Sequence, residues 1–220
     1  MGEATGSAAA ASRRDEVRCH AHHAARPTAA RPATAKAAGN GDGADPEAAP
    51  SGMVAVLGME RGAVLALCDT CRGDGILQVA NVLCPGNVVV SGTAGACGRL
   101  AAAATAAGAM KCVPLEVAGG FHTALMEPAV ERLAAALADV SLEPPRIPVV
   151  SNVDARPHTD PDEIRRLLAR QVVGVVEWSD SMAYILSTGV RSVWEVGPGR
   201  VLRGLMKRID RSVACSGALD

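Results

Sequence analysis

Aromatic side chains are scarce in this chain of 220 residues, which has two tryptophans, one tyrosine and one phenylalanine. The core must therefore be packed with Val, Leu, Ile, Met and Ala rather than with rings. No apolar run reaches the ~18 residues that a transmembrane helix requires, so no membrane span is expected. An excess of one charge is also lacking, because the formal net charge is -1. The chain therefore has no net positive charge of the kind that attracts nucleic acid.

Cysteine spacing shows no disulfide framework. The seven cysteines are an odd number scattered along the chain, which favours free thiols in a reducing compartment. Cys68 and Cys71 form one C-x-x-C pair at the end of a helical pattern, and no second pair follows at zinc spacing. A thiol or metal protein built on this pair is therefore a remote alternative. We expect neither a bound metal nor a cofactor.

Residues 1–50 contain no Leu, Ile, Phe, Trp or Tyr. Such a segment buries too little apolar surface to offset the entropy of ordering, so we expect a disordered low-complexity leader. Its arginines resemble those of an organelle transit peptide, although Glu3, Asp15 and Glu16 argue against that interpretation. Residues 19–23, with the sequence CHAHH, could bind metal adventitiously. An incorrect gene start is a further interpretation of the leader.

An ordered pattern begins at residue 51. Alternating or continuous apolar residues between Gly and Pro turns predict four strands and two helices in the order βαββαβ. The strands are expected at 53–57, 77–83, 87–91 and 111–117, and the helices at 60–71 and 93–107. This order is that of the ferredoxin-like arrangement. We therefore predict a ferredoxin-like subdomain over residues 51–118.

The remaining chain is expected to form one part of a domain over residues 119–212, followed by a tail at 213–220. Its pattern predicts further strands that alternate with helices, which implies an α/β fold with a largely parallel sheet. Strands are expected at 148–153 and 192–196, and a short helix at 179–187. Other helices are expected to open at Glu127-Pro128, with a buried stripe of Val130, Leu133, Ala134 and Leu137, and at Asp160-Pro161. The last helix, from about Arg200, is expected to bury Val201, Leu202, Leu205, Met206 and Ile209 and to expose Arg203, Lys207 and Arg208.

His122 lies between a predicted strand and a predicted helix, directly after Gly119, Gly120 and Phe121. Two glycines permit a close approach of backbones that a Cβ resists. Strand-to-helix corners are also where α/β enzymes expose catalytic groups. Histidine titrates near neutral pH, so His122 is a candidate general base if a nucleophile lies within hydrogen-bond reach. The alternative is a purely structural histidine.

Gln171 falls on the apolar side of the helix that opens at Asp160. Ile164, Leu167 and Leu168 define the inward stripe, and Gln171 is its next position. A buried amide without partners costs about 1–3 kcal/mol. Either Gln171 is partly solvated at the helix end, or a carbonyl there accepts the Nδ1–H of His122. The second arrangement leaves Nε2 free as a base, as the aspartate of a serine-hydrolase triad does.

Three stretches of the chain together resemble one family. They are ANVLCPGNVVVSG (residues 80–92), AGGFHTALMEP (118–128), and a discontinuous set of PVVSNVD (148–154), RQ (170–171) and EVGPG (195–199). In this order and spacing they resemble the malonyl-CoA:acyl-carrier-protein transacylases of type II fatty-acid synthesis, the plastid forms in particular. The resemblance covers about residues 52–211.

The resemblance implies a partial α/β-hydrolase-like acyltransferase domain with a ferredoxin-like subdomain. It also implies a ping-pong reaction in which a serine takes malonyl from malonyl-CoA and passes it to the phosphopantetheine thiol of acyl carrier protein. His122 matches the catalytic base and Gln171 the glutamine that orients it, while Asn81 matches a substrate-binding position. No cofactor, nucleic acid or membrane is implied, and the complete enzyme is expected to be a monomer.

Several motifs of that family are absent. The chain has no G-Q-G segment for an oxyanion hole, no G-H-S-x-G elbow for a nucleophile and no arginine matched to the malonyl carboxylate. Leu83 and Asn87 replace the asparagine and glutamine that are usual at those positions. We therefore expect the carboxy-terminal part of a transacylase, inactive alone. Its expected location is a plastid, or otherwise the cytoplasm. The alternative is a non-catalytic module that docks acyl carrier protein or a complementary chain.

Overall fold

The computed structural model of the chain describes residues 16–20 and 50–218, and its helices and strands confirm the α/β class. It divides into two compact units, Arg26–Tyr184 and a smaller one made of Met1–Ala25 with Ile185–Asp220. The boundary expected at residue 118 therefore lies inside the larger unit. Within the range expected to be a leader, Glu16–His20 forms strand β1. The interpretations of residues 1–15 and 21–49 fall outside the described residues.

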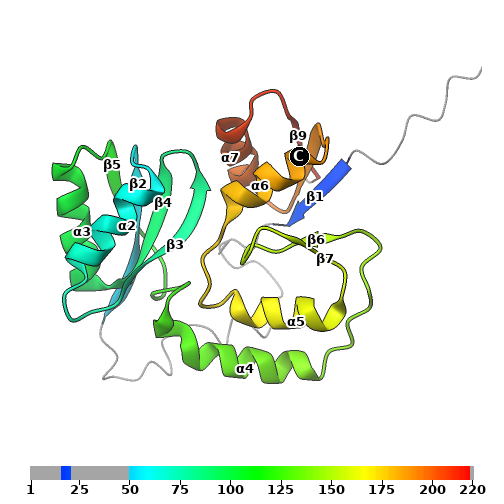
Figure 1. Cartoon of the computed structure of the whole chain (residues 1–220), viewed down its shortest axis with the longest axis horizontal. Coiled ribbons are helices and arrows are strands. Elements are labelled where there is room, and N and C mark those ends of the chain that lie inside the picture. Colours follow the sequence, from blue (N-terminus) through cyan, green and yellow to red (C-terminus); the bar gives the residue numbers. More distant parts are fainter. Residues whose placement is uncertain (1–15, 21–49, 219–220) are drawn as a thin grey trace, which may run out of the picture. The chain divides into compact units, whose positions relative to one another are not determined.

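The larger unit contains a four-stranded antiparallel sheet in the order β3-β4-β2-β5, with two helices on one face (Figure 1). Its strands are β2 (Ser51–Leu57), β3 (Leu77–Cys84), β4 (Asn87–Thr93) and β5 (Lys111–Leu115). Its helices are α2 (Arg61–Cys71) and α3 (Ala94–Ala106). The elements follow the order that the sequence predicts, with β5 ending two residues earlier than expected.

The core of this sheet depends on a bulge in β3. Val79 pairs with Val90 whereas Asn81 pairs with Val89, so β3 holds one extra residue at this point. Because side chains alternate along a strand, the extra residue changes which ones face the helices. Val82 therefore joins Val79 in the helix-facing core, together with Val54, Val56, Val64, Cys68, Leu77, Val88, Val90, Ala96, Cys97, Leu100 and Ala104.

The opposite face of the sheet carries a second, smaller apolar cluster. Met53, Ala80 and Val89 are buried there, and Phe121 is one of the partly buried side chains packed against them. Phe121 is the chain's only phenylalanine, and its ring anchors the segment that follows β5 onto the sheet. The residue next to it, His122, is positioned by this contact.

The rest of the larger unit is built from short helices and one hairpin. After the turn η1 (Ala124–Met126) come α4 (Glu127–Ala138), the hairpin of β6 (Val149–Val150) and β7 (Pro157–His158), α5 (Pro161–Arg170) and the start of α6 (Trp178–Ser187). The expected capping of α5 is confirmed, since Asp160 Oδ1 accepts the N–H of Glu163 at 2.7 Å.

Three expectations for this region are wrong. The strand expected over 148–153 is only two residues long, because the chain turns back after it and Ala155 adopts a φ of 56°. In α4 the expected stripe is only partly covered: Val130, Leu133 and Leu137 are half-buried, but Ala134 is exposed and Ala129 is the residue that is fully buried. In α5 Leu168 is 38% exposed and Ala169 is buried, so the inward stripe is rotated.

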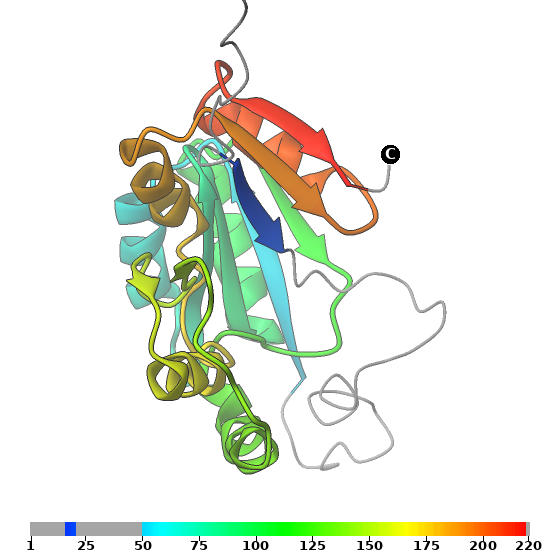
Figure 2. The same ribbon diagram turned by 90° about the vertical axis from the view of Figure 1, so that its right-hand side faces the viewer.

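The smaller unit is a three-stranded parallel sheet in the order β1-β8-β9. Figure 2 shows β8 (Ser192–Val196) and β9 (Ala214–Gly217) side by side with α7 (Val201–Ile209) along them. Residues 213–220, expected as a tail, thus contain a strand. Val201 is 49% exposed rather than buried, whereas Leu205 and Met206 are buried as expected.

The side chain of Arg203, which the sequence places in solvent, is only 13% exposed, because it pairs with the buried carboxylate of Glu195 at 3.2 Å. The same carboxylate accepts the main-chain N–H groups of Leu202 and Arg203 at the start of α7. Those N–H groups have no partner within the helix, so Glu195 satisfies them and complements the positive end of the helix dipole.

Candidate active site

The segment before α4 folds tightly around Gly120. Its N–H donates to Ser51 Oγ at 3.0 Å, and its carbonyl accepts from the buried hydroxyl of Thr123 at 2.6 Å. A Cβ at Gly120 would lie 2.8 Å from Leu125 Cδ1 and 3.3 Å from Ser51 Cβ, so a larger residue would displace both neighbours. The close approach predicted from the two glycines is therefore present at Gly120.

His122 adopts a left-handed backbone conformation, with a φ of 61°. This region disfavours residues with a Cβ, and non-glycine residues held there occur preferentially at functional sites. The main-chain N–H of His122 donates to the Val172 carbonyl at 3.2 Å. The unusual backbone angle is thus stabilised by a bond to the turn that follows α5.

The imidazole of His122 is held at Nδ1 by two main-chain carbonyls. Nδ1 lies 3.0 Å from the Gln171 oxygen and 3.1 Å from the Gly174 oxygen. A carbonyl oxygen can only accept a hydrogen bond, so Nδ1 must carry the proton. In the neutral ring Nε2 is then unprotonated and presents a lone pair. This is the tautomer that a general base requires.

Gln171 lies where the sequence predicts, but the atom that contacts His122 belongs to its main chain. Gln171 is the C-cap of α5, so its carbonyl is one of those that the helix leaves without an internal partner. Its side-chain Oε1 instead lies 3.4 Å from Asn152 Nδ2. The negative end of the helix dipole adds to the effect of the two carbonyls, because it favours a positive charge on the imidazole.

The segment 171–177 is fixed to the four-stranded sheet. Val176 forms a parallel bridge with Asn81 at the edge of β3, through Val82 N to Val176 O at 2.9 Å and Val176 N to Ala80 O at 2.8 Å. Glu177 accepts both terminal nitrogens of Arg61 at 2.9 and 2.8 Å. Two-point Arg–carboxylate contacts are geometrically specific, so the carbonyls at 171 and 174 are held on a braced segment.

Asn81, expected at a substrate-binding position, lies at the β3 bulge and is half-buried. Its bridge with Val176 places it on the same edge as the segment that holds His122. Leu83 packs partly buried on the face of the sheet that Phe121 contacts. Asn87 is buried in β4. The structure therefore brings Asn81 to the edge that braces the site, and its contact with substrate stays a prediction.

The thiol and metal alternatives find no support among the described residues. Burial, with Asp69 and Cys71 as smaller contributors, raises the pKa of the Cys68 thiol to about 12. That thiol is therefore protonated and a poor nucleophile near neutral pH.

In the part of the chain that the structure describes, no group of three or more His, Cys, Asp or Glu side chains is arranged to hold a metal ion. In that same part, no helix combines the length and apolarity needed to cross a bilayer.

Burial lowers the pKa of His122, and the contacts with the Gln171 and Gly174 carbonyls, which favour the charged ring, offset this only in part. Below the ordinary histidine pKa the unfolded chain therefore binds a proton that the folded chain does not, so His122 makes the fold less stable as the pH falls. The free energy of unfolding of the wild type minus that of His122→Asn should decrease from about pH 7.5 to pH 5.5. Urea denaturation at several pH values measures it, and a difference that increases would contradict the assignment.

The sequence did not indicate several groups that build this site. The carbonyl of Gly174 and the Arg61–Glu177 pair carry no local motif, and their partners lie 52 and 116 residues away. The glycine at 174 is a weak signal. A Cβ there would approach the Arg170 carbonyl at 3.1 Å, which indicates the tight turn that aims the Gly174 carbonyl.

The solved structures that the chain resembles are acyltransferases with a mixed α/β fold. One is the malonyl-CoA:acyl carrier protein transacylase of Xanthomonas oryzae, with a TM-score of 0.74 and 39% identity, covering 76% of this chain and 54% of that one. Another is a malonyl-transacylase in complex with the acyl carrier protein of a type II PKS, with a TM-score of 0.75 and 34% identity, covering 78% of this chain and 55% of that one.

Among curated proteins, the chain is 39% identical over 173 residues to the malonyl CoA-acyl carrier protein transacylase of Escherichia coli K12. The match covers 77% of this chain and 56% of the relative. The chain therefore spans about half the length of the curated relatives it matches. No family model matches the chain.

Proposed function

We propose that residues 51–212 belong to a malonyl-CoA:acyl-carrier-protein transacylase. The observation that carries this proposal is the imidazole of His122 held at Nδ1 by the carbonyls of Gln171 and Gly174. Similarity to the E. coli transacylase supports it independently. The substrates proposed are malonyl-CoA and acyl carrier protein, and the reaction needs no cofactor. The subdomain 51–118 is proposed to be ferredoxin-like.

His122 would act twice in each turnover. Its Nε2 takes the proton of a serine hydroxyl while the serine oxygen attacks the malonyl thioester carbonyl, and the resulting imidazolium then gives that proton to the departing coenzyme A thiolate. In the second half-reaction Nε2 takes the proton of the phosphopantetheine thiol, whose sulfur attacks the malonyl-serine ester. The serine oxygen leaves and recovers the proton. The carbonyls at Nδ1 stabilise the imidazolium in both halves.

The serine is proposed to lie outside this chain, since none of its serines sits in a G-x-S-x-G frame. Residues 1–220 alone should then transfer no malonyl above the uncatalysed rate. Transfer should appear when the nucleophile-bearing amino-terminal piece of the E. coli relative is added, measured as malonyl on acyl carrier protein by mass spectrometry. Transfer by the chain alone at the rate of a complete relative would refute this placement of the serine.

A non-catalytic module is the second candidate, and the same absence of an elbow favours it. Under this alternative the chain binds acyl carrier protein with an affinity that the amino-terminal piece does not change, and no mixture transfers malonyl. A plastid location is proposed on the arginine-bearing leader and on the resemblance to plastid transacylases. Fusion of residues 1–50 to a fluorescent protein in plant cells tests it, and a cytoplasmic signal would exclude it.

A further inference from the structure

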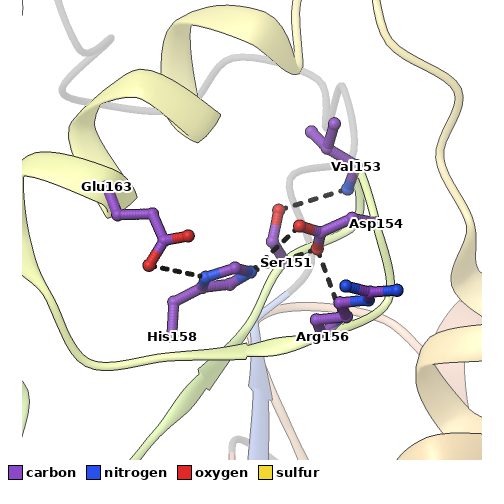
Figure 3. Close-up of polar contacts among 6 residues, drawn as sticks. All are labelled: Ser151, Val153, Asp154, Arg156, His158 and Glu163. Carbon is purple, nitrogen blue, oxygen red and sulfur yellow. Dashed lines mark hydrogen bonds and ion pairs between the residues drawn. The ribbon is translucent and has the colours of Figure 1, made fainter.

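His158 lies between two carboxylates from different elements (Figure 3). Its Nε2 is 3.2 and 3.1 Å from the two oxygens of Asp154 in its own hairpin, and its Nδ1 is 3.1 Å from Glu163 Oε2 in the first turn of α5. The ring is 8% exposed, whereas the side chains of Asp154 and Glu163 are 29% and 45% exposed. The three side chains therefore form a clamp between the hairpin and α5.

Both ring nitrogens of His158 face acceptors, so only the doubly protonated ring can donate to both. A neutral ring would turn one lone pair towards a carboxylate, and one of the two contacts would be lost. Among the described residues, the charged groups that contact the ring are Asp154 and Glu163. Arg156 extends from the same hairpin and donates its main-chain N–H to Asp154 Oδ1 at 3.1 Å (Figure 3). Both contacts therefore form only while His158 is charged, and the clamp is weaker when the ring is neutral.

The hairpin loop continues from the clamp to the segment that holds His122. The loop is closed by Ser151 N to Arg156 O at 3.0 Å and Ala155 N to Ser151 O at 2.9 Å. At its tip the Asn152 carbonyl accepts the N–H of Glu177 at 2.8 Å. A Cβ at Gly174 would lie 3.5 Å from Val153 Cγ1, so the loop also packs on the turn that presents the Gly174 carbonyl.

The Glu163 side of the clamp is also connected to the carbonyls that contact His122, through helix α5. Glu163 lies in the first turn of α5, and the C-cap of that helix is Gln171, whose carbonyl contacts His122 Nδ1. A helix of ten residues is stiff along its axis, so fixing its first turn against the hairpin fixes the distance between its last turn and the hairpin loop. The carbonyls of residues 171 and 174 are then held in one arrangement, by the hairpin loop and by helix α5.

We propose that His158 is a positioning residue, which in its charged form clamps the hairpin to α5 and so keeps the two carbonyls on Nδ1 of His122. This inference rests on the proposed function only in that it takes His122 to be the general base. Although burial disfavours the charged ring, the hydrogen bonds of Asp154 and Glu163 raise the pKa of His158 above its ordinary value. The clamp therefore contributes fully below the ordinary histidine pKa and is lost as the pH rises through the raised pKa of the folded state.

Hydrogen exchange in the full chain, without substrate, tests this inference. In the wild type the protection factors of the Glu177 amide and the His122 Nδ1–H should be about tenfold higher near pH 6 than near pH 8. In His158→Gln both should be low at either pH. Amides of the β2–β4 ladder serve as the control and should be unchanged.

Wild-type protection in His158→Gln at both pH values would overturn the proposal, as would a wild type without pH dependence. Glu163→Gln provides a second route if His158→Gln does not fold, because the amide oxygen still accepts from Nδ1 while the charge is removed. It should reduce the pH dependence, and a profile identical to that of the wild type would equally overturn the proposal. Because no transfer is measured, failure here is separate from failure of the proposed acyl transfer.

Discussion

His122→Asn should lower malonyl transfer by about 10⁴-fold or more in the mixture of this chain with a nucleophile-bearing piece. Loss of the histidine of a serine-protease triad costs about 10⁶-fold, so a loss of at least about 10⁴-fold is expected when the serine lacks its base. Asparagine is preferred over alanine because His122 has a φ of 61°, and asparagine is among the residues that tolerate this region. The backbone and its bond to Val172 should therefore persist. Initial rates of malonyl transfer to acyl carrier protein measure the loss.

Arg132→Ala is the matched control, since Arg132 is exposed on α4. It should leave the rate within twofold or so, as surface substitutions generally do. Binding of acyl carrier protein to His122→Asn should also be unchanged. A loss of less than about tenfold would show that His122 is structural, and it would favour the non-catalytic module.

Gly92→Ala should destabilise the larger unit by about 3 kcal/mol, because the new methyl group would overpack a backbone that cannot move away. A Cβ at Gly92 would overlap the Ile76 carbonyl oxygen and would lie 2.9 Å from Leu77 Cα. That same oxygen accepts the N–H of Thr93 at 2.9 Å, so its displacement would also break the end of the β3–β4 pairing. Urea denaturation followed by circular dichroism measures the change.

Gly98→Ala is the control for this substitution. Gly98 lies within α3 and is exposed, and a methyl group added there would meet no neighbouring atom within 4 Å. Alanine there should stabilise the protein by about 0.5–1 kcal/mol, because it reduces the entropy lost on forming the helix. Equal effects of the two substitutions would show that the approach of Gly92 to Ile76 is not tight.

The sequence predicts well those elements that are specified by local pattern. Strands β2 to β5 alternate or bury both faces, and helix α5 opens with a cap, a proline and an acid, so periodicity and capping place them within a few residues. Strand β9 (Ala214–Gly217) has a weakly β-forming sequence, and β1 pairs with β8 from more than 170 residues away. Such elements depend on non-local pairing, which a local pattern does not specify.

The site is predictable to the same extent. His122 and Gln171 can be identified because the sequence sets them in unusual places, next to paired glycines and at the next position of a predicted apolar stripe. The atoms that hold the ring are main-chain carbonyls, and every residue has one. Only the path of the backbone decides which carbonyl meets Nδ1, and that path is set by the Val176 bridge and the Arg61–Glu177 pair.

The tautomer of His122 is the most direct test of this account. Two-bond ¹H–¹⁵N correlation spectra of the chain, labelled at histidine and recorded above the pKa of His122, distinguish the protonated from the unprotonated ring nitrogen. The two carbonyls at 3.0 and 3.1 Å predict a proton on Nδ1 and a bare Nε2. A ring protonated on Nε2, or one that averages between the two forms, would contradict the assignment of His122 as a positioned base.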